Sequence, residues 1–260
     1  MTQAPFRVAP LAPMIAKQIQ TECLRLLRLP AFSIASIVLP IMFFAFFGLS
    51  GANTPAFGTT AGKYLLASFA AYAVVNIALF SFGAGVAAER GTGATTLMRA
   101  APLQPMAYFI GKLVAALAFA AVALIALIAF AEIAGGIRVA PGLLTVLMVR
   151  LLLGSMPFVL LGFAIGYLAN INAAIAIINL TYLPLAFASG LFVPLADLPR
   201  VVQQVAPYLP TYHFAQLAWT LFGAGSESVV TAILWLAGYS AAFLIIALRA
   251  YWREEKLKFT

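Results

Sequence analysis

The chain has 260 residues, of which 64% are hydrophobic and 8% are charged, and its formal net charge is +8. Soluble domains average about 45–50% apolar and about 25% charged residues, so this composition excludes a soluble globular protein and indicates a polytopic membrane protein. The basic residues are scattered, which is typical of loops on the cytoplasmic side of a membrane and not of nucleic-acid binding, and a single cysteine (Cys23) and a single histidine (His213) argue against a disulfide, a zinc site or any other metal centre.

The first predicted element is an amphipathic helix over Leu11–Leu29. Apolar residues recur on one side and polar or basic residues on the other: Ile15, Ile19, Cys23 and Leu26 against Lys17, Thr21, Arg25 and Arg28. Such a helix lies in the membrane interface, with its apolar side at the acyl boundary and its basic side at anionic lipid headgroups. It is either a simple anchor or an anchor that also touches a cytoplasmic partner.

Six stretches are long and apolar enough to cross a hydrocarbon core of about 30 Å. In chain order they are Phe32–Leu49, Tyr64–Ala87, Phe109–Ala131, Leu143–Leu168, Ile171–Val193 and Val229–Leu248. We therefore predict an all-α integral membrane protein with one transmembrane domain over residues 1–260. Within it, an interfacial segment (1–30) precedes the six-span region (32–248), and a cytoplasmic tail (249–260) follows.

The positions of lysine and arginine predict the orientation, because positive loops stay on the cytoplasmic side. If both termini lie in the cytoplasm, eleven basic residues face inward: Arg7, Lys17, Arg25, Arg28, Arg90, Arg99, Lys112, Arg249, Arg253, Lys256 and Lys258. Three face outward: Lys63, Arg138 and Arg200. Both termini are therefore predicted to be cytoplasmic, and the absence of an early apolar run argues against a secretory leader.

The loop between the second and third spans, Ala88–Pro105, is the longest internal cytoplasmic segment. It begins with Glu89, Arg90, Gly91, Thr92 and Gly93. The two glycines are expected to break the preceding helix, and Thr92 to cap a short helix that Pro102 ends. The pattern predicts a compact knob close to the membrane, with an ordinary positive-inside hairpin as the alternative.

The segment between the fifth and sixth spans, residues 194–228, has apolar residues at helical spacing. These are Leu198, Val201, Val202, Val205, Phe214, Leu217 and Leu221, and the aromatic residues are Tyr208, Tyr212, Trp219 and Phe222. Asp197 is expected to cap a first short helix and Thr211 a second that ends at Gly223. We predict two short outer helices that lie flat in the interface or re-enter the bilayer, with His213 as a structural hydrogen-bonding residue.

Two features inside the fourth span have structural interpretations. Arg150 is expected to snorkel or to pair with Glu132, and contact with cargo is the alternative. Gly162 and Gly166 form a small-xxx-small pattern that predicts close helix packing.

Two segments resemble the permease subunits of type 2 ABC exporters. The first contains Glu89-Arg90-Gly91-Thr92-Gly93, then Leu97, Met98, Arg99, Ala100, Ala101, Pro102 and Leu103, and finally Gly111-Lys112. The second contains Ser189-Gly190-Leu191-Phe192-Val193-Pro194, Leu198-Pro199 and Leu209-Pro210-Thr211-Tyr212-His213. Because the length, the six spans and the predicted orientation also agree, the resemblance covers nearly the whole chain.

The resemblance implies a complex of two permease copies, expected to be a homodimer, with two copies of a separate ABC ATPase subunit. This chain lacks a Gly-x-x-x-x-Gly-Lys-Ser/Thr phosphate loop, so ATP and Mg²⁺ are expected on the ATPase, and the chain itself is not predicted to be an enzyme or to hold a cofactor. The coupling residues implied for contact with the ATPase are Glu89, Arg90, Gly91, Thr92, Gly93 and Arg99. Charged pairs between Glu89 or Arg90 and the ATPase are the specific hypothesis.

The resemblance also implies a cargo path between the two permease copies, lined by the second and fifth spans. Candidate path residues are Tyr72, Asn76, Asn179 and Tyr182, with hydrogen bonding between helices as their alternative role. Tyr72 and Asn76 share a helix face because they are one turn apart. The spans carry almost no charge, so we expect an apolar or amphipathic cargo, first a drug or antibiotic and otherwise a lipid or lipid-linked glycan, exported across a bacterial cytoplasmic (inner) membrane.

Two other classes of function are alternatives to an ABC permease. An ion-coupled secondary transporter needs an ionisable residue near the bilayer midplane, and Glu132 and Arg150 are the only candidates. An intramembrane aspartyl enzyme needs two carboxylates, whereas Asp197 is the only aspartate and lies in a loop. The transporter is the alternative function, and the enzyme is disfavoured.

Overall fold

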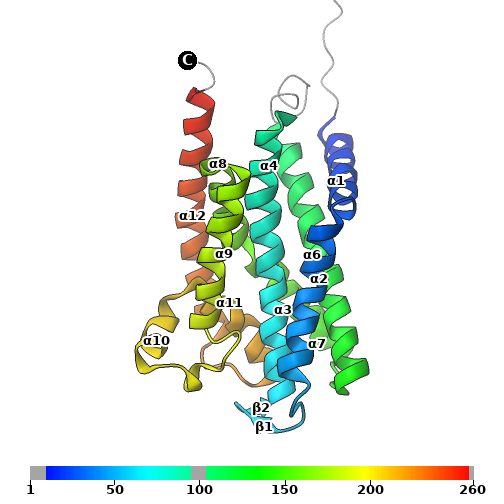
Figure 1. Cartoon of the computed structure of the whole chain (residues 1–260), viewed down its shortest axis with the longest axis vertical. Helices are drawn as coiled ribbons and strands as arrows, with labels where there is room; N and C mark the ends of the chain where they lie inside the picture. The colour runs from blue at the N-terminus through cyan, green and yellow to red at the C-terminus, as the bar shows by residue number, and fades with distance from the viewer. Residues whose placement is uncertain (1–9, 95–103, 258–260) are drawn as a thin grey trace, which may run out of the picture.

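The computed structural model describes residues 10–94 and 104–257, with side chains through Glu254. Helices make up almost all of this part of the chain and run along the long axis of the molecule (Figure 1). They are α1 (Leu11–Leu27), α2 (Pro30–Phe43), the π-helix η1 (Phe44–Gly48), α3 (Ala61–Leu79), the π-helix η2 (Phe80–Ala84), α4 (Gly85–Gly91), α6 (Pro105–Gly135), α7 (Pro141–Gly154), α8 (Met156–Leu168), α9 (Ile171–Ala188), η3 (Leu195–Asp197), α10 (Arg200–Val205), η4 (Ala206–Tyr208), α11 (Pro210–Trp219), η5 (Thr220–Phe222) and α12 (Val229–Leu257).

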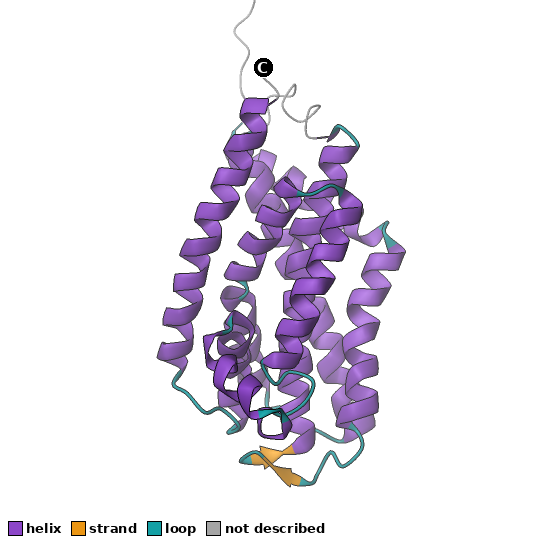
Figure 2. Ribbon diagram, turned by 60° about the vertical axis from the view of Figure 1, so that its left-hand side comes forward, coloured by secondary structure: helices purple, strands orange, loops and turns teal. Residues whose placement is uncertain are grey.

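One short antiparallel hairpin joins the first two spans. Its strands β1 (Pro55–Ala56) and β2 (Thr59–Thr60) pair with Pro55 opposite Thr60, and Gly58 occupies the left-handed region at φ 78° in the turn. Figure 2 shows this hairpin at the end of the molecule opposite the carboxyl-terminal end of α12. We call the end that carries α1 and the end of α12 the terminal end, and the hairpin end the distal end.

Six helical segments are long and apolar enough to cross a membrane, which confirms the predicted six spans and the all-α membrane class. Their bounds are Pro30–Gly48, Ala61–Gly91, Pro105–Gly135, Pro141–Leu168, Ile171–Ala188 and Val229–Glu254. Two predicted bounds were wrong. The fifth span stops at Ala188 and not at Val193, because the chain turns at Gly190 with φ 85°, and the last helix continues past Leu248 to Leu257.

The second span is the centre of the bundle and packs against the first, third, fourth and fifth spans. In its most apolar window 83% of the residues are buried inside the chain, against 11% for the last span. A helix that is apolar all round is stable at such a position because every face meets another helix. The last span, in contrast, leaves most of its surface for lipid or for another protein.

Small residues allow α8 to lie very close to the second span. A Cβ atom at Gly166 would lie 2.6 Å from the Phe82 carbonyl oxygen, and one at Gly162 would lie 3.1 Å from the Leu79 carbonyl oxygen. No larger residue fits there without moving the backbone of one helix. The packing role predicted for this glycine pair is therefore confirmed.

The two short helices at the distal end differ from each other. α10 is largely exposed, with Val201 at 71% of its full accessibility, whereas every residue of α11 is buried. α11 packs against α3, α7 and α12, so this element lies inside the distal end of the bundle and not on its surface. Tyr212 and Trp219 are accordingly buried and do not form part of an interfacial belt.

The predicted caps of these helices were also wrong. Pro199 precedes α10 and Leu209 precedes α11, neither with a side-chain cap, while Asp197 belongs to the turn η3. Thr211 lies inside α11, where its hydroxyl donates to the Leu185 carbonyl oxygen (3.1 Å) and contacts Ser189. Thr211 is therefore bonded to α9 and does not cap its own helix. Gly223 ends the segment at φ 79°, as predicted.

Arg150 connects the fourth span to α11. Its Nη1 donates to the Leu217 carbonyl oxygen (3.3 Å) and to the Thr220 hydroxyl (3.1 Å). No ion pair with Glu132 occurs among the residues that the structure describes. The guanidinium satisfies the carbonyl end of α11, so neither snorkelling nor that pairing is needed to explain it.

Candidate functional site

The last turn of α4 holds Glu89 and Arg90, the pair on which the coupling hypothesis rests. α4 continues the central span through η2, so this turn is the point where the core of the bundle reaches the terminal end (Figure 1). Consecutive residues on a helix point about 100° apart. The two side chains therefore reach different neighbours.

Glu89 enters a buried cluster of charges, which we call the Glu89 cluster: Glu22, Arg25, Glu89, Tyr108 and Lys112. The Lys112 ammonium lies 2.5 Å from Glu89 and 3.3 Å from Glu22, and the Tyr108 hydroxyl donates to the other oxygen of Glu89 at 2.5 Å. Arg25 lies 2.9 Å from Glu22 and 3.5 Å from Glu89. Two carboxylates thus meet two cations, and the cluster is formally neutral.

Burial makes this neutrality necessary. Lys112 is 1% exposed, Glu22 3% and Glu89 7%. A buried ion without a counter-ion loses its hydration with no compensation, so removal of one partner from such a group is strongly unfavourable. The cluster therefore constrains the relative positions of α1, α4 and α6 far more strictly than an exposed ion pair would.

Arg90 connects the same turn to the opposite side of the bundle. Its Nη1 donates to the carbonyl oxygens of Gly166 (2.6 Å) and Ala169 (3.2 Å) at the end of α8. Its Nε lies 2.5 Å from a Glu254 oxygen on α12, and its guanidinium stacks on the Tyr167 ring at 5.4 Å. The Arg–carboxylate pair and the contact with a helix carboxyl end are both favourable.

The face of α1 that meets the protein is polar, which the sequence did not predict. Gln18, Glu22 and Leu26 are buried against α6, while Ile15 and Ile19 are only half-buried. Gly111 of α6 permits this approach, because a Cβ atom there would overlap the Gln18 side chain. The ion pairs of Glu22 outweigh the apolar periodicity in setting how the helix is rotated.

The remaining coupling residues lie at the surface. Gly91 is the last residue of α4, and Gly93, at φ 75°, is where the helix breaks. The Thr92 hydroxyl donates to the Ala88 and Glu89 carbonyl oxygens (both 3.2 Å) at the end of α4, and the short helix that it was predicted to cap falls on residues outside the described part of the chain. Arg99 and the rest of segment 95–103 lie outside the described residues.

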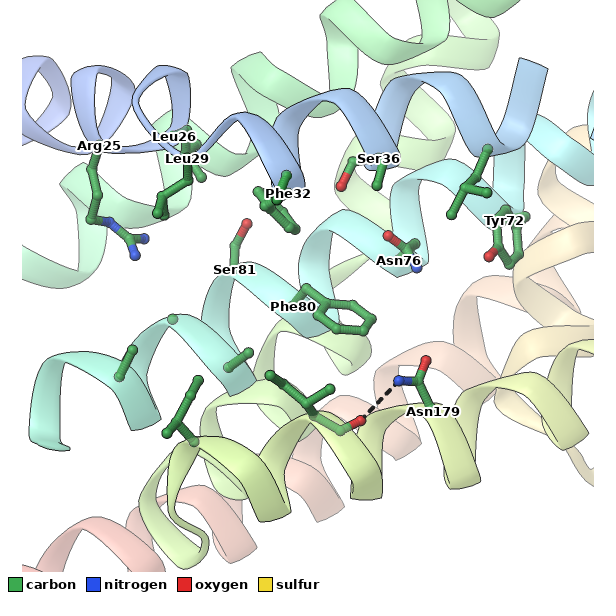
Figure 3. A pocket seen from close by; sticks show the side chains of 18 of the residues that line it. Arg25, Leu26, Leu29, Phe32, Ser36, Tyr72, Asn76, Phe80, Ser81 and Asn179 are labelled. Atoms are coloured by element: carbon green, nitrogen blue, oxygen red, sulfur yellow. Dashed lines mark hydrogen bonds between the residues drawn. The ribbon is translucent and has the colours of Figure 1, made fainter. Parts of the chain in front are cut away.

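A groove of about 620 Å³ opens between α2, the second span and α9. Tyr72, Asn76 and Asn179 line it together, as Figure 3 shows, and the Asn179 amide donates to the Ile175 carbonyl oxygen (3.1 Å). Three of the four predicted path residues thus share one cavity, although they come from two spans.

Tyr182 does not line this groove. It is 1% exposed and stacks behind Tyr72 with ring centroids 5.3 Å apart, and its hydroxyl donates to the Tyr72 carbonyl oxygen at 2.8 Å. This hydrogen bond between α9 and α3 is the alternative role that the sequence left open for it. Tyr182 supports the groove wall from behind.

The polarity of the groove changes along its length. Arg25 is the only charged residue among those that line it, and it lies at the end next to the Glu89 cluster. The other lining groups are apolar or neutral, with Phe32, Phe43 and Phe80 among the largest. Arg25 is therefore shared by the two sites, and a change in one site can reach the other through a single side chain.

The sequence did not single out Glu22, Tyr108, Lys112 or Glu254 as site residues. One signal was present: Glu22 and Arg25 are three residues apart, and Tyr108 and Lys112 are four apart, so each pair shares a helix face at the edge of an apolar stretch. Ionisable groups at such depth need partners and are functional candidates by default. Which partners they take depends on how the helices pack.

Six spans, a buried ionic connection at one end and an open groove between spans define a membrane transport subunit. The ABC-2 type transporter family matches residues 18–222, and the chain belongs to this family. The matched range includes Glu22, Glu89, Lys112 and the groove. The chain is therefore the membrane subunit of an ABC transporter.

Two relatives agree with this assignment. YvfS of Bacillus subtilis (strain 168), which carries the name of a transport permease, is 27% identical over 235 residues, covering 90% of this chain and 95% of YvfS. The inner membrane transport permease YhhJ of Escherichia coli (strain K12) is 33% identical over 132 residues. That match covers 43% of this chain and 35% of YhhJ.

Proposed function

We propose that this chain is the permease of an ATP-driven exporter, in which two copies pair and two separate ATPase subunits bind at the terminal end. The terminal end is then cytoplasmic, in a bacterial inner membrane, as the distribution of positive charge predicts. The cargo is a drug-like or other apolar or amphipathic molecule that leaves through the groove. Family membership supports the class, and the contacts of Glu89 and Arg90 support the mechanism.

The single observation that carries the mechanism is that one helical turn is bonded to four other elements. Glu89 connects it to α1 and α6, and Arg90 connects it to α8 and α12. A displacement of the exposed Gly91–Gly93 end by an ATPase therefore moves these helices together. We therefore replace the hypothesis that Glu89 and Arg90 form ion pairs with the ATPase. Both side chains act as positioning residues inside the permease, and the Gly91–Gly93 end contacts the ATPase.

Movement of this turn changes the groove because the groove shares its wall. Gly85 and Ala88 of α4 line it, and the Arg25 guanidinium lies about 3.3 Å from where a Cβ atom of Gly85 would be. A shift of α4 relative to α9 widens or narrows the space between them. Closure of the ATPase pair on ATP would thus open or close the cargo path without any charge entering the membrane.

The test is ATP hydrolysis by the permease purified with its candidate ATPase in lipid nanodiscs. Glu89→Gln combined with Lys112→Met, which removes one charge of each sign, and separately Arg90→Gln should leave the complex assembled but uncouple it, so that cargo no longer changes the ATPase rate. Glu132→Gln and Arg138→Gln, exposed residues of the distal end, are the matched controls and should behave as wild type. Coupled hydrolysis in both the Glu89 and the Arg90 variants would refute the mechanism, and a wild-type permease that does not change the rate of the ATPase would refute the proposed pairing of the two subunits.

A further inference from the structure

Ser81, in the π-helix of the second span, has a buried hydroxyl without a partner. The residue is 3% exposed, and its Oγ makes no hydrogen bond to any residue that the structure describes. Two other serines of the spans bond to their own helix: Ser68 donates to the Tyr64 carbonyl oxygen (3.0 Å) and Ser240 to that of Leu236 (2.8 Å). A buried hydroxyl without a partner is costly, so its retention needs an explanation.

The π-helix η2 accounts for the missing local bond and gives the hydroxyl its direction. The wider turn over Phe80–Ala84 replaces the ordinary α-helical geometry in which a serine bonds back by one turn. Short π-helical segments inside α-helices are frequent at functional sites. In Figure 3 the Ser81 side chain points away from its own helix and toward Phe32 of α2, across the groove.

Two further neutral polar groups line the same groove near Ser81. Asn76 precedes it on the second span, and Ser36 faces them from α2 (Figure 3). Within the described part of the chain neither side chain takes part in a hydrogen bond or ion pair. A neutral hydroxyl or amide on a visiting molecule would find donors and acceptors here that nothing in the chain occupies.

A charged group on a bound molecule would be unfavourable beside Ser81. Arg25, the one charged lining residue, is already paired with Glu22 (2.9 Å) and lies 3.5 Å from Glu89. A charge placed beside Ser81 would therefore lose its hydration without gaining a counter-ion. A neutral polar group loses less and regains a hydrogen bond.

We propose that Ser81, with Asn76 and Ser36, forms a subsite that binds one uncharged hydrogen-bonding group of an apolar, drug-sized cargo. The volume of about 620 Å³ suits one such molecule, since small-molecule sites span about 300–1,000 Å³. Phe32 and Phe80 provide the apolar contacts on either side. The proposal rests on the proposed function, because it assigns a substrate class to the same groove.

The test uses photo-crosslinking of the full-length permease alone in nanodiscs. The probes are three diazirine-bearing dodecyl compounds that differ only in the head group: a hydroxyl, a carboxylate or a quaternary ammonium. The hydroxyl probe should label peptides from α2, α3, α4 and α9, and the charged probes should not. Ser81→Ala should lower the labelling by about three- to tenfold, the equivalent of one hydrogen bond. Ser240→Ala, whose hydroxyl lies outside the groove, should leave it unchanged.

Three outcomes would overturn the proposal. They are equal labelling by all three probes, unchanged labelling of Ser81→Ala, and a change of oligomeric state in Ser81→Ala, which would mean that the hydroxyl bonds to a second copy. If Ser81→Ala lowers the yield of folded protein, Asn76→Leu measures the same subsite from its other side. Since no ATPase is present, labelling can succeed while the exporter assignment fails, or the reverse.

Discussion

The two ends of this bundle bury polar groups in different ways. At the terminal end, charged side chains of different helices pair with one another although they are 23 to 164 positions apart in the sequence, such as Lys112 with Glu22 at 3.3 Å. At the distal end the buried contacts are mostly neutral: the Trp219 indole donates to Ser68 (2.9 Å), and the Tyr64 hydroxyl donates to the Gly190 carbonyl oxygen (2.8 Å). Among the described residues one acid–base pair lies at this end, His213 with Glu227 (2.8 Å), and it joins residues only 14 apart.

The difference lies in how much free energy is lost when each kind of contact is broken. Buried ion pairs lose much free energy when one partner moves away, so they connect helices that must move together. Neutral hydrogen bonds and stacked aromatic rings, such as Tyr64 on Trp219 with centroids 5.1 Å apart, fill space and seal it at a lower cost per contact. Under the proposed mechanism the terminal end transmits a displacement, whereas the distal end packs around α11.

The largest expected effect comes from removing one cation at the terminal end. Lys112→Met should destabilise the protein by about 3–5 kcal/mol, because Glu22 and Glu89 stay buried with Arg25 as their only cation. The measurement is the midpoint of thermal unfolding in detergent, followed by size-exclusion chromatography. The double variant Glu89→Gln, Lys112→Met removes one charge of each sign, keeps Glu22 paired with Arg25 (2.9 Å), and should recover much of the loss. A wild-type midpoint for Lys112→Met alone would show that the cluster is not a strong connection.

A smaller effect is expected at the distal end from Trp219→Phe. The change removes the hydrogen bond to Ser68 and part of a ring that is 3% exposed, and it should cost about 1–3 kcal/mol. Ser68 keeps its bond to the Tyr64 carbonyl oxygen, so no hydroxyl is left without a partner. The same unfolding assay reports it, with Trp252→Phe, at an exposed position, as control. A loss of stability as large as that of Lys112→Met would show that the two ends do not differ in the strength of their buried contacts.

The smallest of the three effects is expected from Thr211→Val in α11. The shape is kept, and only the hydrogen bond to the Leu185 carbonyl oxygen and the contact with Ser189 are lost, so about 1 kcal/mol is expected. Coupled ATP hydrolysis should stay at the wild-type level, because the residue is far from the turn that bears Glu89. Uncoupling without a loss of stability would place part of the transmission at the distal end.

The sequence was sufficient wherever the physics is local. A span depends on the apolar length of one segment, so all six were predicted, and the helix end at Gly223 and the close packing at Gly162 and Gly166 follow equally from single residues and their spacing. Glu89 and Arg90 could be singled out because both lie where a span meets a glycine-broken loop. Their placement was predictable, but their partners were not.

Only the tertiary structure decided what these residues touch. Glu22 and Lys112 are 90 positions apart and meet because α1 packs on α6. α11 is buried because Ser68 and Leu185 of other helices accept its hydrogen bonds, which no local pattern encodes. The hydropathy of a segment sets whether it leaves water, since that free energy is a sum over its own residues. The pairing of buried polar groups is a property of helices brought together, and it appears only once they are packed.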